Sequence, residues 1–168
     1  MKEMEVMLRV TCAELPSLIG QEIGPSDWTT ITQEMVNQYA NGVKDLEWIH
    51  VDVERANKVL GGTIVHGLLT LSLVPWMSRN MLHIADRGTD LNYGYDNVRF
   101  LAVVRGGDRV RLRRRILELS PRGEGLLLNS ECTVEVEGSK QPALVANWKL
   151  LLFPGKDTIP RREPAKAA

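Results

Sequence analysis

The chain has 168 residues, of which 43% are hydrophobic and 25% charged, a composition typical of a globular protein with one sizeable core. Its 21 basic and 21 acidic residues give a formal net charge of zero, so we expect no nucleic-acid partner. Two cysteines, Cys12 and Cys132, lie far apart outside any motif and favour neither a disulfide framework nor a zinc site. The beginning of the chain lacks the pattern of a secretion signal, and Arg79 and Asn80 interrupt the longest apolar run. Together these features predict a soluble, cytoplasmic protein with no membrane partner.

The first half of the chain is predicted to be mostly helical. Residues 5–15 favour a short helix that ends before Pro16, and the β-branched residues at 28–31 favour a short strand. Thr32 is the expected N-cap of a helix over residues 33–41, because its hydroxyl can accept a hydrogen bond from a free N–H of the first turn.

Two further helices follow. Asp52 is the expected N-cap of a helix over residues 53–60, which the glycine pair 61–62 terminates. Residues 66–84 are apolar on nearly every side at first, as in a helix that is buried all round. Pro75 within this stretch is expected to kink the helix or to mark where it leaves the core.

The second half of the chain favours strands. Gly106 and Gly107 predict a hairpin turn between the first two of them. Long antiparallel strands after one apolar helix predict an α+β fold, in which the sheet wraps around that helix. The final residues, 155–168, are rich in Pro, Lys and Arg and predict a loose tail, which leaves residues 1–154 as a single domain. The four predicted strands span 97–104, 109–119, 126–138 and 143–153. In the second and third of them two faces alternate, and Val110 and Val134 lie on the less polar face of their strands.

The most basic run of the chain is Arg113, Arg114 and Arg115. One interpretation is a solvated strand face whose arginines pair with the acidic strand over residues 131–137. The alternative is a contact with a phosphate-bearing ligand, because arginine binds phosphate well.

Asp45, His50 and Asp52 lie close together in a stretch without a clear period. The residue types of this stretch alone favour a solvated loop before a helix. Asp45 and His50 are also spaced so that they can act as general base and acid through one shared water. A metal site that includes Asp52 lacks a compact ligand spacing.

His66 and Gly67 stand where an extended segment meets the apolar helix. N–H groups in the first turn of a helix have no intrahelical acceptor, and the helix dipole adds positive potential there. Glycine at position 67 lets a ligand oxygen approach those N–H groups, which is the physics of an oxyanion hole. The alternative is that His66 makes a hydrogen bond across the start of the helix.

Three blocks of the sequence, residues 26–56, 61–75 and 91–100, together resemble the MaoC-like dehydratases. The resemblance is to the nodulation-protein-N-like branch, which is related to (R)-specific enoyl-CoA hydratases, and it runs from about residue 19 to 153. The hydratase motif of this family is an aspartate, four residues, a histidine and, about sixteen residues later, His-Gly. Its positions here are Asp45, His50 and His66-Gly67.

The resemblance implies a hotdog fold, a curved antiparallel sheet wrapped around a long central helix, usually dimerised into a continuous sheet. It also implies a hydro-lyase of fatty-acid metabolism, which reversibly hydrates a trans-2-enoyl thioester to the (R)-3-hydroxyacyl thioester. The substrate partner would be an acyl-CoA or an acyl-carrier-protein thioester, and the chain would form a homodimer or higher homo-oligomer. Neither a cofactor nor a metal is expected.

By the same resemblance, Asp45 and His50 form the acid/base pair that activates the water. The backbone N–H of Gly67 polarises the thioester carbonyl. Weaker candidates for lining the acyl or pantetheine path are Asn92, Tyr93 and Gly94.

The motif departs from the family pattern at two places. Lys44 replaces a glycine where the backbone is expected to need a positive φ, which is uncommon for lysine. Glu47 and Trp48 stand where hydratases of the better-known type carry asparagine and proline. Two other functions therefore stay open: a non-catalytic acyl-thioester-binding protein in which Lys44 has disabled the site, and a hotdog thioesterase.

Overall fold

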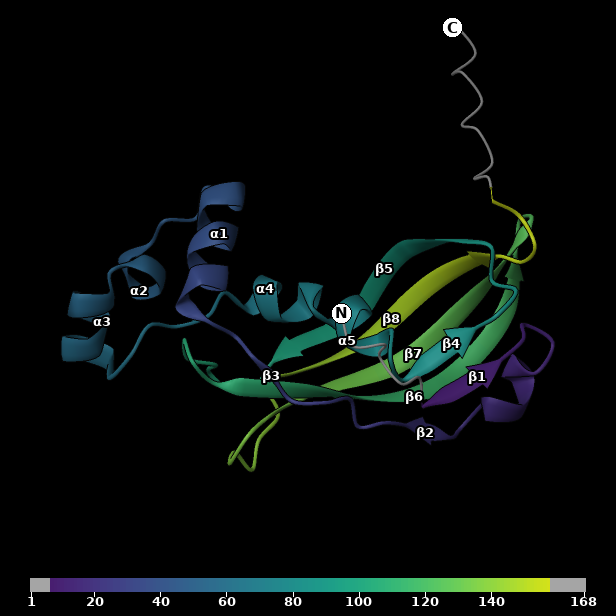
Figure 1. Cartoon of the computed structure of the whole chain (residues 1–168), viewed down its shortest axis with the longest axis horizontal. Helices are drawn as coiled ribbons and strands as arrows, with labels where there is room; N and C mark the ends of the chain where they lie inside the picture. Colours follow the sequence, from purple (N-terminus) through teal and green to yellow (C-terminus); the bar gives the residue numbers. More distant parts are fainter. Residues whose placement is uncertain (1–6, 158–168) are drawn as a thin grey trace, which may run out of the picture.

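The structure, a computed structural model, describes residues 7–157 (Figure 1). Its main sheet has the strand order β2-β6-β7-β8-β5, and β3 pairs with β6 beside β2. All pairs in this sheet are antiparallel. A smaller sheet consists of β1 and β4, which are parallel. The strands are β1 (Leu8–Val10), β2 (Glu22–Ile23), β3 (Thr29–Thr30), β4 (Leu82–Ile84), β5 (Thr89–Phe100), β6 (Arg109–Arg122), β7 (Gly125–Val136) and β8 (Leu144–Phe153).

The helices occupy two places relative to the main sheet. In Figure 1, α4 and α5 lie over the face of the curved sheet, and α1, α2 and α3 gather at one end of it. This arrangement confirms the predicted α+β fold with a sheet wrapped around a helical segment. Within residues 7–157, none of the helices is long and apolar enough to cross a bilayer. The helices are η1 (Leu15–Leu18), α1 (Gln33–Val43), α2 (Trp48–Val51), α3 (Val53–Leu60), α4 (Gly67–Ser72) and α5 (Val74–Ser78).

The predicted N-caps are confirmed. Thr32 Oγ1 accepts a hydrogen bond from the backbone N–H of Met35 at 3.2 Å at the start of α1. Asp52 Oδ1 accepts one from the N–H of Arg55 at 3.0 Å at the start of α3. Gly61 ends α3 with a φ of 73°, in the left-handed region that glycine enters at no steric cost.

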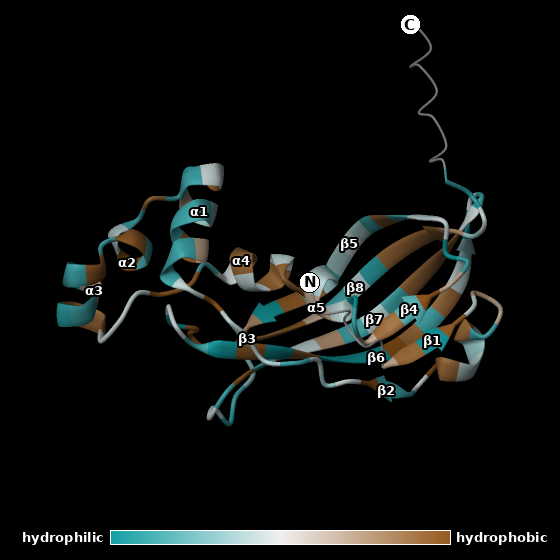
Figure 2. Ribbon diagram, in the orientation of Figure 1, coloured by the Kyte–Doolittle hydropathy of each residue, from teal (hydrophilic) through white to brown (hydrophobic). Residues whose placement is uncertain are grey.

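The core lies between the sheet and the α4–α5 segment. Val110, Leu112 and Ile116 alternate along β6 and are fully buried. They pack with residues of the same cluster on α5, such as Val74 and Met77. Burial of each such side chain contributes about 1.5–3 kcal/mol. Figure 2 shows hydrophobic residues concentrated along the sheet, whereas α1 and α3 are mostly hydrophilic.

The long helix predicted over residues 66–84 is wrong beyond Ser78. The helical segment is broken at Leu73 between α4 and α5, close to Pro75. Residues 82–84 form β4, which pairs in parallel with β1, and the helix predicted over 5–15 is therefore also wrong. Short apolar runs fit a strand as well as a helix, and the pairing of Leu8 with Leu82 is too distant in sequence to read locally.

The hairpin predicted at Gly106 and Gly107 is wrong too. The first long strand spans 89–100 rather than 97–104, and it pairs with β8 at the far edge of the sheet instead of with β6. Residues 101–108 instead cross from one side of the sheet to the other. On the way they bond to the segment before α4, through Val65 N to Val104 O at 2.8 Å and Gly106 N to Thr63 O at 3.1 Å.

The tail predicted from residue 155 is only partly within the described residues. The Gly155 N–H donates to Asp86 O at 2.9 Å, and the Lys156 ammonium pairs with Glu124 at 2.7 Å. Residues 158–168 lie outside the described residues, so the predicted domain boundary at residue 154 stays a prediction.

Candidate active site

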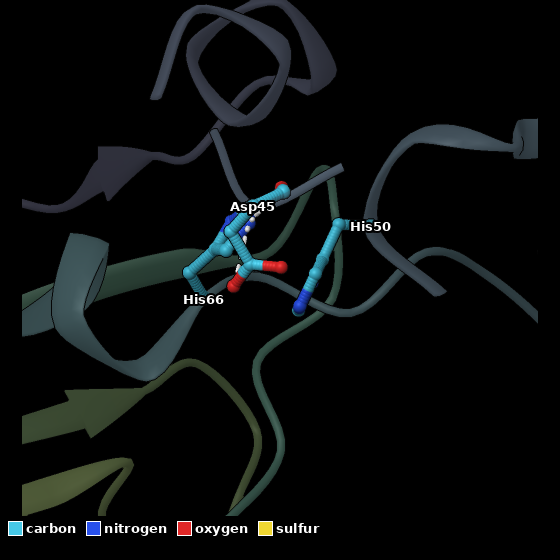
Figure 3. A group of neighbouring side chains, drawn as sticks. All are labelled: Asp45, His50 and His66. Carbon is cyan, nitrogen blue, oxygen red and sulfur yellow. Dashed lines mark hydrogen bonds and ion pairs between the residues drawn. The ribbon is translucent and has the colours of Figure 1, made fainter. Parts of the chain in front are cut away.

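Three polar side chains converge at the end of the sheet that carries α1 to α3 (Figure 3). They are Asp45, in the loop after α1, His50, in α2, and His66, directly before α4. One ligand-type atom from each lies within 4.8 Å of the others. His50 and His66 are buried, whereas the Asp45 side chain is 48% exposed. We call these three residues the histidine cluster.

The end of α1 fixes the position of Asp45. Lys44 ends the helix in the left-handed region with φ 64° and ψ 25°, and the Asp45 N–H closes the turn on Ala40 O at 3.1 Å. The positive φ expected at position 44 is thus present. A lysine adopts it at a strain of about 1 kcal/mol. The turn also directs the Asp45 backbone carbonyl toward His66 Nε2, at 3.1 Å.

The ring of His50 is held by a backbone carbonyl. Its Nδ1 lies 2.5 Å from Ile64 O. A carbonyl oxygen only accepts hydrogen bonds, so Nδ1 carries the proton and Nε2 keeps a lone pair. His50 therefore has a free basic nitrogen in a fixed direction.

Gln33, at the start of α1, supports His50 through hydrogen bonds. Its Nε2 donates to the backbone carbonyl of His50 at 2.8 Å, and its Oε1 accepts from Thr63 Oγ1 at 2.5 Å. Gly106 lies against this pair, where an added Cβ would come within 2.5 Å of Thr63 Oγ1. Gln33 could not be recognised from the sequence, because a polar residue in the first turn of a helix is ordinary and gives no signal.

His66 completes the cluster. Its Nε2 faces the Asp45 carbonyl at 3.1 Å and the Asp45 carboxylate at 3.7 Å, so it meets the expectation of a hydrogen bond across the start of the helix. Its ring stacks on that of His50 with 3.6 Å between centroids, and the centroid of the Tyr39 ring lies 5.1 Å from that of His66. Its Nδ1 is buried without a hydrogen-bond partner among residues 7–157.

Asp52 does not join this group, because its carboxylate caps α3. His66 takes its place among the donors that could hold a metal. These donors spread over as much as 4.8 Å, whereas ligands about 2.1 Å from a tetrahedral zinc lie about 3.4 Å apart. The cluster is therefore too loose for a compact zinc site, and its spacing suits a bound water with hydrogen bonds to several groups.

The cluster opens into a hollow of about 380 Å³, which Gly67 and Leu68 also line. These same two residues line a neighbouring apolar groove of about 400 Å³. Gly67 begins α4, so its N–H has no intrahelical acceptor. An added Cβ at Gly67 would lie 2.9 Å from the ring of Phe100. The glycine is therefore required for the close approach of these two elements.

The structure brings Asp45, His50 and Gly67 together but does not bring residues 92–94 to them. Asn92 lies eight residues before Phe100 on β5, a separation of about 26 Å at about 3.3 Å per residue. Asn92 Oδ1 accepts a hydrogen bond from Trp148 Nε1 at 2.9 Å, and Tyr93 hydroxyl accepts one from Arg122.

The architecture is a hotdog fold. An unliganded R-hydratase from Pseudomonas aeruginosa superposes on it with a TM-score of 0.65 at 17% sequence identity, over 89% of this chain and 92% of that one. Residues 14–123 match the family model described as MaoC like domain.

Two curated proteins are similar over most of this chain. Nodulation protein N from Rhizobium leguminosarum bv. viciae is 44% identical over 146 residues, covering 84% of this chain and 91% of that protein. The 3-hydroxyacyl-thioester dehydratase Z from Mycobacterium tuberculosis (strain CDC 1551 / Oshkosh) is 43% identical over 136 residues, covering 80% of this chain and 90% of that protein. The chain belongs to the MaoC-like dehydratase family.

Proposed function

We propose that the protein is a hydro-lyase that adds water across the C2–C3 double bond of a trans-2-enoyl thioester to give the (R)-3-hydroxyacyl thioester, and that it catalyses the reverse dehydration. One observation carries the proposal. A carboxylate, a histidine with a free basic nitrogen and the first N–H of a helix converge on one open hollow. Its similarity to a 3-hydroxyacyl-thioester dehydratase supports the same chemistry.

His50 Nε2 and the Asp45 carboxylate both have acceptor atoms for the two protons of one water. One of these two groups removes a proton from the water as the water oxygen bonds to C3. A proton is then returned to C2, and this completes the addition. No electron carrier is needed, because the elements of water account for every atom that the product gains. General acid–base catalysis of this kind contributes about 10²–10⁴-fold to the rate.

Gly67 serves the carbonyl end of the substrate. Negative charge develops on the thioester oxygen as water adds to C3, and the Gly67 N–H at the start of α4 stabilises it. The apolar groove beside Gly67, lined by residues such as Phe100 and Val103, provides a surface for the acyl group. The carrier on the thioester is coenzyme A or an acyl-carrier protein.

We also propose that the chain forms a homodimer through the edge of its sheet. β5 is twelve residues long, and within residues 7–157 it pairs with β8 on one side only. An edge of this length is a template for pairing with a second strand. Phe100 and Leu101 expose 49% and 46% of their surface at its end, and light scattering of the purified chain measures the assembly.

The test of the reaction is an absorbance assay with crotonyl-CoA and longer trans-2-enoyl-CoA substrates. Hydration removes the conjugated-thioester absorbance, and a stereospecific dehydrogenase reads the configuration of the product. Asp45→Asn and His50→Gln are each expected to lower kcat/KM by at least about 100-fold with unchanged circular dichroism. Asp52→Asn is the matched control, because this nearby acid only caps α3 and asparagine caps as well as aspartate.

Three results contradict the proposal. Equal activity of all three variants would remove Asp45 and His50 from the chemistry. Release of free CoA, detected with a thiol reagent, identifies a thioesterase instead. Saturable binding of acyl-CoA with no turnover at any chain length identifies a non-catalytic binding protein.

A further inference from the structure

Arg114 is a buried arginine at the other end of the α4–α5 segment. The three consecutive arginines of β6 alternate across the sheet. Arg113 and Arg115 face outward and pair with acids, Arg113 with Glu22 and Glu135 and Arg115 more loosely with Glu22. The interpretation as a solvated face paired with the strand over residues 131–137 is therefore right for Arg113, which pairs with Glu135. Arg115 is exposed but pairs with Glu22 instead, and the interpretation is wrong for Arg114, which is only 3% exposed.

The contacts of Arg114 are with neutral groups. Its Nε donates to Ser130 Oγ at 3.0 Å and its Nη1 to Ser78 Oγ at 2.8 Å. Its guanidinium lies 4.9 Å from the centroid of the Trp148 ring. Its Nη2 is buried without a hydrogen-bond partner among residues 7–157. Two hydroxyls and an aromatic ring offset part of the cost of burial, but none of them carries a negative charge.

The nearby titratable groups do not neutralise Arg114 either. Burial raises the pKa of the Cys132 thiol to about 11 and the pKa of the Tyr95 hydroxyl to about 12, so both are uncharged at neutral pH. Burial also lowers the pKa of Arg114, yet a guanidinium in a protein does not lose its proton. A permanent positive charge is therefore buried without a counter-ion from residues 7–157.

Arg114 lines a hollow of about 120 Å³, together with Ser78, Asn92 and Trp148. We call it the arginine pocket. At its rim, Arg87 pairs with Asp90 at 2.9 Å, which leaves Arg79 as a positive side chain with no ion pair within the described residues. The pocket shares no lining residue with the hollow beside the histidine cluster.

We propose that the arginine pocket is a binding site for a small carboxylate, separate from the reaction site. The Nη2 group and the second hydrogen of Nη1 present two parallel N–H donors, which match the two oxygens of one carboxylate. A single negative charge balances the single buried positive charge. The small volume suits a group such as acetate or propionate, and a phosphate dianion would bring a second negative charge that the single buried guanidinium does not balance.

The test uses the purified full chain and sodium acetate at constant ionic strength, maintained with sodium chloride. Acetate is expected to raise Tm saturably, because a ligand that binds only the folded state stabilises it, and to change the fluorescence of Trp148, which contacts Arg114. Propionate is expected to act like acetate. Sodium phosphate at the same ionic strength is expected to have no saturable effect.

Three variants locate the site. Arg114→Met is expected to weaken acetate binding at least tenfold, whereas Arg115→Met removes the same charge from the outer face of the same strand and leaves binding unchanged. Arg114→Lys keeps the positive charge but loses the planar fork of the guanidinium, and it is also expected to bind acetate at least tenfold more weakly. This variant replaces Arg114→Met in the comparison if Arg114→Met does not fold.

The proposal fails if acetate and chloride have the same effect on the unaltered chain. It fails equally if the Arg114 and Arg115 variants respond to acetate alike. Saturable binding of phosphate but not of acetate would overturn the assignment to carboxylates. Each of these results is independent of enoyl-thioester hydration, which is measured separately.

Discussion

The two ends of the α4–α5 segment hold buried polar groups of different kinds. At the histidine cluster, His50 and His66 are oriented by the backbone carbonyls of Ile64 and Asp45, and they can be neutral. At the arginine pocket, Arg114 cannot lose its charge, and its protein partners are hydroxyls. A carbonyl that accepts from one ring nitrogen leaves the other free to act as a base. A buried guanidinium without an acid leaves an unbalanced positive charge, which the proposed carboxylate would balance.

Apart from the changes at Asp45 and His50, the largest effect is expected at Gly67, on the cluster side of this comparison. Gly67→Ala places a Cβ 2.9 Å from the Phe100 ring, and we expect this contact to displace the start of α4 with its N–H as well as the ring. A displacement of about 1 Å lowers catalysis about 100-fold, so we expect a loss of this size in kcat/KM. Gly42→Ala is the control, since nothing lies within 4 Å of a Cβ there. Equal activity of the two variants would place Gly67 away from the reacting thioester.

A smaller loss is expected when the support of His50 is removed. Gln33→Ala leaves the His50 carbonyl and the Thr63 hydroxyl without their partner, at a cost of about 1–3 kcal/mol in unfolding free energy. We expect kcat to fall about tenfold with little change in KM, because Gln33 positions His50 and does not touch substrate. Gln38→Ala, on the same helix, loses only a bond to Glu34. A Gln33→Ala variant as active as this control would show that His50 needs no such support.

A gain in unfolding free energy, rather than a loss, is expected from a substitution at the arginine pocket. Replacing a buried, incompletely compensated ion with an apolar side chain of similar length is often stabilising. In chloride buffer without carboxylate, Arg114→Met is therefore expected to raise the unfolding free energy by about 1–2 kcal/mol. Urea unfolding measures the change. With saturating acetate the gain should shrink, and a large loss of stability in both buffers would contradict the interpretation of an unbalanced charge.

The smallest effect is expected at Lys44. Lys44→Gly relieves the left-handed conformation at φ 64° and should stabilise the chain by about 0.5–1 kcal/mol, with hydration activity unchanged. Lys44→Ala removes the ammonium but keeps the strain, so it should unfold at the same denaturant concentration as the parent. A strong rise in activity in both variants would instead show that Lys44 impairs the site.

Local features of the sequence were enough to predict several elements. Thr32 and Asp52 were identified as caps, because a capping side chain bonds within three residues of itself. The alternation of β6 and β7 correctly placed Val110 and Val134 inside. Asp45 and His50, which the family motif singled out, line one hollow, and their roles in the reaction stay a prediction.

Features that depend on distant contacts were missed. The pairing of β1 with β4 joins residues that are more than seventy positions apart. The Gly106–Gly107 turn resembled a hairpin, because the residues of a turn do not reveal which strands pair with each other. Arg114 sits on the inward face by the same alternation that placed Val110, but an arginine inside is contrary to the usual preference. No local rule could have shown that its neighbours would all be neutral.

Phe100 connects the edge of the sheet with the candidate active site. Phe100 ends the edge strand β5 and also packs against Gly67. A second copy that pairs along β5 would contact the Phe100 ring and thereby fix the position of the first turn of α4. Dilution would then lower the specific activity of the enzyme, so that turnover per chain reports how many chains are paired.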